Sequence, residues 1–285
     1  MFPDIGAPIA ETVNQFVEWL IVEHGAFFES IANGVLVVLV AIEQTLRNAP
    51  PPVILAGVGV IAFAASRNIL LSLAMVFLAW LVGCLGLWEQ AMQTVALLIV
   101  AVGISIILGI PLGVLTARSS ISRAVINPIL DLMQTIPSFV YLIPAAMLFG
   151  LGKVPAILAT VIYATPPLIR LTDLGIRQVD HDVVEASRAF GATRGQILRG
   201  VQIPLALPSI MQGINQTMMM ALAMVVIASM IGARGIGETV LIGLQRNDPG
   251  TGLLGGLAIV ILAVIFDRTS QAFGTRLQAY RRVRS

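Results

Sequence analysis

Residues 91–117 read AMQTVALLIVAVGISIILGIPLGVLTA, a run of 27 residues without a charged side chain. A helix needs roughly 20 mostly apolar residues to cross the hydrocarbon core of a bilayer. The single proline of the run, Pro111, and its glycines are tolerated in membrane helices. The run therefore predicts a transmembrane α-helix.

The same apolar pattern recurs along the chain, at 51–66, 69–87, 136–151, 154–172, 211–233 and 253–272. The composition agrees, because 57% of the residues are hydrophobic and only 11% are charged, against about 25% charged residues in a soluble domain. So few charges cannot cover the surface of a water-soluble globule. We therefore expect an all-α polytopic membrane protein with about seven transmembrane helices.

The first 50 residues form an acidic N-terminal segment of a different kind. Residues 1–29 carry five acids and no Lys or Arg, whereas a secretory signal peptide needs a basic start. The apolar run 31–42 is short, contains Asn33 and is followed by Glu43. We predict a peripheral helix lying at the membrane interface here, with a spanning helix as the alternative.

The rest of the chain divides by its relation to the membrane. Two N-terminal transmembrane helices are expected in 51–90, and five more in 91–272, around one long polar loop at 173–210. A basic tail, 273–285, ends the chain. Arg and Lys remain on the cytoplasmic side of short loops. Placing the C-terminus inside puts 13 of the 17 basic residues in the cytoplasm and leaves only Arg47, Lys153, Arg234 and Arg246 outside.

The polar loop carries helix signals at 180–208, which read DHDVVEASRAFGATRGQILRGVQIPLALP. Asp182 followed by Glu185 matches a capping box, so a helix is expected to begin at Val183. It should end near Gly191, because glycine is favoured just after a helix C-terminus. Its apolar patch would consist of Val184, Ala186, Ala189 and Phe190.

A second short helix is expected directly after this glycine. Thr193 and Gln196 form another capping box, and the helix should stop before Pro204, since the residue before a proline disfavours α geometry. Short helices are marginal in water on their own. The pair therefore either docks on another protein or packs under the membrane helices of its own chain.

The loop resembles the cytoplasmic signature of binding-protein-dependent ABC importer permeases. That signature is Glu-Ala-Ala, three residues, Gly, nine residues and Ile-x-Leu-Pro, and this chain has Glu185-Ala186-Ser187, Gly191 and Val201-Gln202-Ile203-Pro204 at the same spacing. The resemblance implies a five-helix type I core and a coupling helix that contacts an ABC ATPase subunit. The residues that it assigns to ATPase coupling are Asp182, Glu185, Ala186, Ser187, Arg188, Gly191, Arg194 and Pro204.

The resemblance narrows to the glycine betaine/proline betaine importer permeases through 130–144, 213–217 and 224–232. It implies a homodimer in the plasma (inner) membrane of a prokaryote, two ATPase subunits and an extracytoplasmic binding protein. The expected cargo is a quaternary amine osmolyte: glycine betaine, proline betaine, choline or carnitine. An amino-acid importer of the same superfamily remains an alternative, as does an ion-driven secondary carrier.

Polar residues inside two of the apolar runs, or directly before one of them, are candidates for a translocation path, because such residues usually face a cavity or another helix. The candidates are Gln134, Thr135, Ser138, Tyr141, Gln212, Asn215 and Gln216. Hydrogen bonding between helices is the alternative role for them. Tyr141 is also an aromatic that could hold a quaternary ammonium by cation–π attraction, although a packing role is the alternative.

The sequence contains no P-loop, nucleophile elbow or zinc-binding helix motif. We therefore expect a transport subunit rather than an enzyme, without cofactor or metal, whose energy comes from a partner. The basic residues are spread between apolar runs, so a nucleic-acid partner is not expected and the bilayer is. A secondary carrier would need ionisable residues at mid-membrane, whereas Asp131, Asp173 and Asp267 lie at the ends of the predicted spans.

Overall fold

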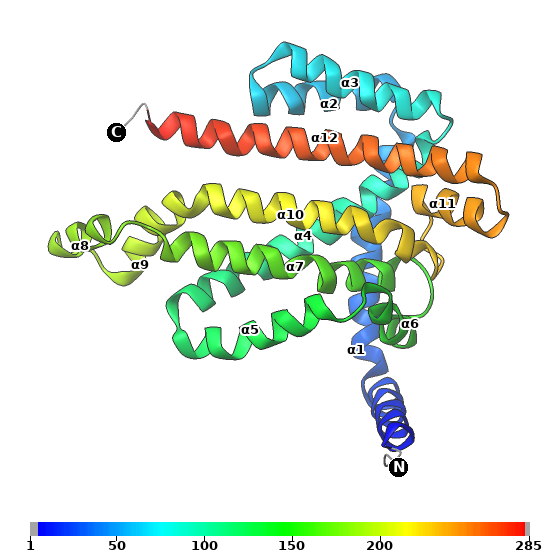
Figure 1. Cartoon of the computed structure of the whole chain (residues 1–285), viewed down its shortest axis with the longest axis horizontal. Helices are drawn as coiled ribbons and strands as arrows, with labels where there is room; N and C mark the ends of the chain where they lie inside the picture. The colour runs from blue at the N-terminus through cyan, green and yellow to red at the C-terminus, as the bar shows by residue number, and fades with distance from the viewer. Residues whose placement is uncertain (1–4, 283–285) are drawn as a thin grey trace.

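A computed structural model describes the backbone of residues 5–282 and the side chains of 5–276, and every regular element in this range is a helix. Three long helices, α7 (Lys153–Arg177), α10 (Ile203–Ser229) and α12 (Pro249–Arg282), run side by side along the long axis (Figure 1). α4 (Trp88–Arg118) packs mainly against α7. These helices confirm the spans predicted at 91–117, 154–172, 211–233 and 253–272.

α7 lies at the centre of the bundle. Of its most apolar stretch, 72% is buried inside the chain, against 22% for α12. Glycines allow α4 and α10 to approach it closely. A Cβ added at Gly113 of α4 would lie 2.5 Å from Cβ of Thr172, and one at Gly175 of α7 would lie 2.6 Å from Cβ of Ser209. α4, α7 and α10 therefore form one tightly packed unit.

The first two predicted spans form a hairpin of short helices, α2 (Pro51–Ser66) and α3 (Ile69–Cys84), beside α12 (Figure 1). Each has 16 residues, about 24 Å of helix, which is shorter than the roughly 30 Å hydrocarbon core. Within the described residues, five helices are long and apolar enough to span, or six if one bent pair counts as a span.

That bent pair corrects the prediction of a continuous span at 136–151. α5 (Ser120–Thr135) is followed by a 3₁₀ turn η1 (Ser138–Tyr141) and α6 (Leu142–Phe149), with a bend of 105° at the break. Pro137 keeps Ile136 out of the α region, at ψ 130°. The Tyr141 hydroxyl donates to the Met133 carbonyl at 2.8 Å and holds the bend closed.

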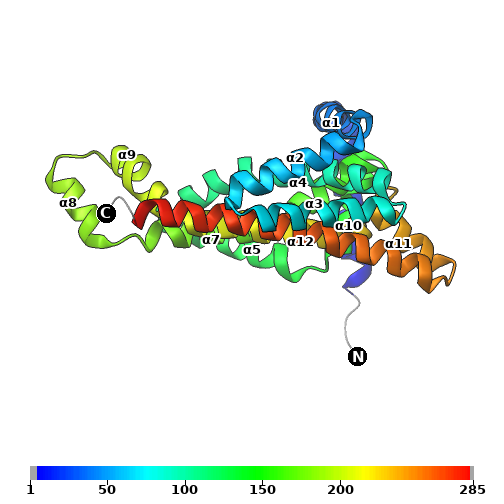
Figure 2. The same cartoon turned by 90° about the horizontal axis from the view of Figure 1, so that it is seen from above.

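α1 (Gly6–Asn48) is one continuous helix of 43 residues that covers the predicted peripheral segment. Its length and composition would allow it to span. However, it runs across the direction of α7, α10 and α12 in both views (Figures 1 and 2). This crosswise course supports the interfacial placement, which stays a prediction; Asp4 lies outside the described residues.

The last part of α1 is fastened to the bundle. Leu39 is fully buried against Ala96 and Ile157. Lys153 Nζ donates to Glu43 Oε2 at 2.6 Å, and Arg47 bridges to Glu89 at 2.7 Å. By contrast, the first 25 residues of the helix bury only Val17. At the other terminus, α12 takes up much of the predicted basic tail, of which residues 283–285 lie outside the described part.

Candidate functional site

The polar loop forms two short helices, α8 (His181–Ala189) and α9 (Arg194–Ile197), which project from one end of the bundle (Figures 1 and 2). We call residues 180–202 the coupling hairpin, after the role that the resemblance predicts for them. The predicted start of its first helix was wrong by two residues. Asp180 is the cap, and its carboxylate accepts from the Asp182 N–H at 3.0 Å, so Asp182 lies in the first turn.

Glycine ends α8 as predicted. Gly191 has φ +81°, a left-handed conformation that favours a residue without Cβ. The Ala192 N–H donates to the Ser187 carbonyl at 3.1 Å, and the Gly191 N–H donates to the Arg188 carbonyl at 2.8 Å. This pair of bonds is the Schellman motif, so the tight turn at Gly191 is confirmed.

The second capping box is also confirmed, but the helix stop is not. Thr193 N–H donates to Gln196 Oε1 at 2.8 Å, and Gln196 N–H donates to the Thr193 hydroxyl at 3.4 Å. The chain then stays helical through a π turn η2 (Leu198–Gln202) into α10, where Pro204 is the second residue. A π turn uses i→i+5 hydrogen bonds in place of the usual i→i+4 bonds of an α-helix. In this register the missing N–H of Pro204 does not remove a regular α-helical hydrogen bond.

The two faces of the coupling hairpin have different surroundings. Val184, Ile197 and Leu198 are buried against their own chain, and Leu198 belongs to a cluster with Ile176 of α7 and Ile210 of α10. Phe190 at the tip is 92% exposed. The inner face therefore links the hairpin to α7 and α10, while an aromatic side chain remains available to a partner.

The charged residues of the coupling hairpin are largely unpaired. Among the described residues, no ion pair joins Arg188 or Arg194 to an acid, and Glu185 only approaches His181, at 3.4 Å. Asp182, Ala186 and Arg188 are exposed, and Ser187 returns its hydroxyl to the Val183 carbonyl. Below the hairpin, buried Asp173 holds Arg177 at 2.8 Å and Arg123 at 3.4 Å. The Arg123 pair ties α5 to α7, whereas the Arg177 pair lies within α7.

The structure separates the candidate path residues into three groups. Gln212 and Gln216 are exposed on α10. Asn215 instead donates to Asp267 of α12 at 2.9 Å and accepts from Ser270 at 2.5 Å, which is the interhelical hydrogen bonding of the alternative role. At the α5–η1 break, Gln134 and Thr135 are exposed, Ser138 is half-buried, and Tyr141 closes the bend.

Sequence reasoning missed the polar contacts between distant segments, and two of them fix the bundle. One is the ion pair between Glu43 and Lys153, the only lysine. The other joins the Thr165 hydroxyl of α7 to Ser105 of α4 at 3.0 Å in the buried interior. In the sequence, each contact is visible only as a single charged or hydroxyl side chain in or beside an apolar run. Such a residue indicates that a polar group needs a hydrogen-bond or ion-pair partner, but the sequence does not show which residue that partner is.

Comparison with known proteins identifies the family. The family model described as "Binding-protein-dependent transport system inner membrane component" matches residues 109–279, which include the coupling hairpin and more than half of the chain. The chain belongs to this permease family. The permease is thus a multi-pass inner membrane protein and the transport subunit of an ABC importer, which also includes an ATPase subunit and a substrate-binding protein.

Several curated permeases are similar over nearly the whole chain. The glycine betaine/proline betaine transport system permease protein ProW of Escherichia coli is 45% identical, over 94% of this chain and 75% of the relative. The glycine betaine transport system permease protein OpuAB of Bacillus subtilis is 43% identical over 93% of both chains. The glycine betaine/carnitine transport permease protein GbuB of Listeria monocytogenes is 41% identical, over 95% of this chain and 97% of the relative.

A solved structure supports the fold alone. A chain of the MetNI methionine ABC transporter in an inward-facing conformation superposes with a TM-score of 0.60 at 24% identity, over 65% of this permease and 93% of that chain. This match confirms the type I importer core that the sequence predicted.

Proposed function

We propose that the permease is one half of a homodimer that imports a quaternary amine osmolyte, driven by two ATPase subunits on its cytoplasmic face. The observation that carries this mechanism is the coupling hairpin, which projects from the bundle with Phe190 exposed and Leu198 packed against α7 and α10. A partner that moves Phe190 therefore moves two of the central helices. A few kcal/mol of differential contact energy is enough to shift such an equilibrium strongly.

The placement of charges supports a cytoplasmic location for the coupling hairpin and the C-terminus. The α2–α3 turn, the α4–α5 turn and the C-terminal end of α12 lie towards the same end of the molecule as the hairpin (Figure 1). This end carries most of the arginines, and the positive-inside rule places such an end on the cytoplasmic side. Lys153 and Arg47 lie at the opposite end, where α1 meets α7.

The exposed polar residues support a second copy and a shared path. Gln212 and Gln216 lie on an exposed stripe of α10, and Gln134 and Thr135 are exposed at the neighbouring α5–η1 break. Polar side chains are costly in contact with lipid. A water-filled path between two copies accommodates them without that cost. We propose these four residues, together with Ser138, as the lining of the path, with Asn215 and Tyr141 positioning the helices around it.

The relatives support the cargo. The three curated permeases are named for glycine betaine, proline betaine or carnitine, all of which carry a fixed positive charge and a carboxylate. We propose a cargo of this class, with choline as a related cation. Selection among such compounds is expected mainly in the binding protein, because the proposed lining consists of uncharged Gln, Thr and Ser side chains.

Reconstitution tests this proposal. The permease, its ATPase and its binding protein are placed in proteoliposomes, and ATP-dependent uptake of labelled glycine betaine, choline and an amino acid is compared. We expect uptake of the quaternary amines only. Uptake of the amino acid alone would refute the cargo, whereas uptake without ATP would refute the mechanism.

Two variants test the coupling role separately. Replacing Gly191 with valine forces a β-branched residue into φ +81°, and replacing Glu185 with alanine alters the exposed face of α8. Both variants should insert normally and lose the stimulation of uptake by ATP hydrolysis. Wild-type uptake in both would count against the assignment of this loop.

A further inference from the structure

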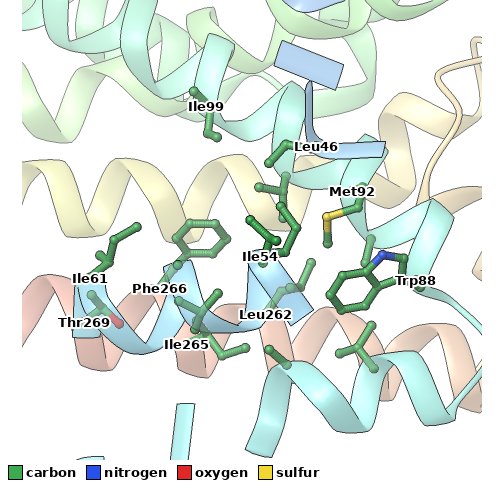
Figure 3. A pocket seen from close by; sticks show the side chains of 17 residues that line it. Leu46, Ile54, Ile61, Trp88, Met92, Ile99, Leu262, Ile265, Phe266 and Thr269 are labelled. Carbon is green, nitrogen blue, oxygen red and sulfur yellow. The ribbon is translucent and has the colours of Figure 1, made fainter. Parts of the chain in front are cut away.

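An apolar cleft separates the α2–α3 hairpin from the core of the bundle. It has a volume of about 310 Å³ and is lined from α2, α4 and α12, with Leu46 of α1 and two residues of α3 (Figure 3). Of its 17 lining residues, only Thr269 is polar. In Figure 3, Trp88 and Met92 of α4 face Leu262 and Ile265 of α12 across the cleft.

A second cavity continues the first. It measures about 240 Å³, lies between α4, α10 and α12, and shares Ile99 and Phe266 with the first cavity. The first follows α4 from Trp88 to Ile99 and the second from Leu98 to Ile106. At 1.5 Å per residue the two together extend about 27 Å, close to the thickness of the hydrocarbon core. Each alone has about the length of one leaflet.

Two helical glycines widen these cavities, Gly57 in the first and Gly103 in the second. A Cβ added to Gly57 of α2 or Gly103 of α4 would meet no atom within 4 Å. They differ from Gly113 and Gly175, whose missing Cβ atoms let helices touch. A glycine inside a helix costs about 1 kcal/mol relative to alanine. Without a close helix contact in return, these two glycines leave room for something that is not part of the chain.

The chemistry and width of the cleft restrict its occupant. A zwitterionic cargo would leave its carboxylate without a partner among apolar side chains. A helix about 10 Å wide and as long as the first cavity would fill roughly 1,250 Å³, far more than the cleft offers. The medium around the rims is hydrocarbon, since Val53, Ile61 and Ile99 are exposed there in a membrane protein.

We propose that this cleft binds the acyl chain of a bilayer phospholipid, which acts as a wedge between the α2–α3 hairpin and the core. The chain is recognised through its hydrocarbon, because the described lining offers no charged group to a headgroup. The bound lipid completes the packing of the N-terminal hairpin on α4 and α12. This inference rests on the membrane location alone and is independent of the proposed cargo and coupling.

The three tryptophans provide the test. Trp88 lines the cleft, whereas Trp80 is 51% exposed and outside the lining. Single-tryptophan permeases, W19F/W80F and W19F/W88F, are purified as full chains in detergent and titrated with phospholipid brominated in its acyl chains, which quenches fluorescence on contact. We expect half-maximal quenching of Trp88 at a lipid concentration about tenfold lower than for Trp80, with equal results for ethanolamine and glycerol headgroups.

Filling the cleft gives the decisive comparison. Gly57→Leu and Gly103→Leu each place a side chain into the open space and should raise the lipid concentration needed to quench Trp88 to the Trp80 value. Val60→Leu, at a position on α2 that is 67% exposed and outside the lining, is the matched control and should change nothing. Equal quenching of the two tryptophans, or quenching of Trp88 that neither glycine variant alters, overturns the proposal.

Discussion

Gly175 is the position where a single added methyl group should push α7 and α10 apart, next to the coupling hairpin. It lies in the last turns of α7, opposite Ser209 and Ala206 of α10. A Cβ there would lie 2.6 Å from Cβ of Ser209 and 3.3 Å from Cβ of Ala206. Carbon atoms in contact are about 3.5–4.0 Å apart, so Gly175→Ala requires the two helices to move apart by about 1 Å.

The magnitude follows from two opposing effects. Overpacking of a tight interface costs about 1–3 kcal/mol, and the upper end applies because the opposing Cβ is fixed to the backbone and cannot rotate away. Alanine regains about 1 kcal/mol of helix propensity. We therefore expect Gly175→Ala to lower the unfolding free energy by about 2 kcal/mol. Gly34→Ala in α1 meets no atom within 4 Å and should raise it by up to about 1 kcal/mol.

Two assays measure the effect. Unfolding in mixed micelles gives the free-energy difference between the two variants, expected to be about 3 kcal/mol from the values above. In proteoliposomes, Gly175→Ala should consume more ATP per imported molecule if, as proposed, the contact between α7 and α10 transmits the movement of the coupling hairpin. If both variants change stability by the same amount in the same direction, the close approach of these helices is not what determines their packing.

Three further variants test individual contacts. Phe190→Ala should weaken ATPase binding about 10- to 100-fold, the equivalent of losing one buried aromatic side chain, whereas Phe77→Ala, an exposed aromatic on α3, should leave pull-down of the ATPase unchanged. Lys153→Met leaves the buried Glu43 carboxylate with only the longer ion pair to Arg47, at 3.5 Å, and should increase proteolysis of α1 at limiting protease. Adding Glu43→Leu should restore protection, and failure of that rescue would argue against the Glu43–Lys153 pair as the fastening of α1. Asp248, in the loop before α12, has a pKa lowered by hydrogen bonds from the Thr251 side chain and backbone. A carboxyl group with a lowered pKa stabilises the folded loop at pH values above its ordinary pKa, and this stabilisation is lost as the pH falls through the lowered pKa. Amide exchange of the loop should therefore accelerate in acid. Asp248→Asn should remove that pH dependence.

The accuracy of sequence reasoning depended on the distance over which each interaction acts. The capping box at Thr193 and the glycine turn at Gly191 were predicted correctly because, in each of them, the hydrogen-bonded residues lie within five positions of one another in the sequence. The first cap was misplaced because Asp180 and Asp182 are chemically equal candidates two residues apart. Pro204 was assigned to a helix end because its missing N–H disfavours an α-helix, whereas the π turn before it accommodates the proline.

The bend at Ile136 and the course of α1 show the limit of composition. Hydropathy identifies 136–151 and 31–42 as apolar, but it does not report whether a helix is straight or which way it runs. Asn215 illustrates the same limit for a single side chain. Its position among glutamines on one helix face suggested a path, and only the arrival of Asp267 and Ser270 from α12, more than 50 residues away, shows how its amide is used.

The amino-acid sequence alone determined the membrane environment and the pair of short helices at 180–202, because apolar runs of membrane length and helix caps are local properties of the chain. It also determined the family, through the spacing from Glu185 to Pro204. Only the tertiary structure decided which glycines bring helices into contact and which leave space, that α1 is fastened by Glu43 and Lys153, and that Leu198 links the coupling hairpin to the bundle. These depend on atoms from distant segments, and their positions are set by the packing of the whole chain.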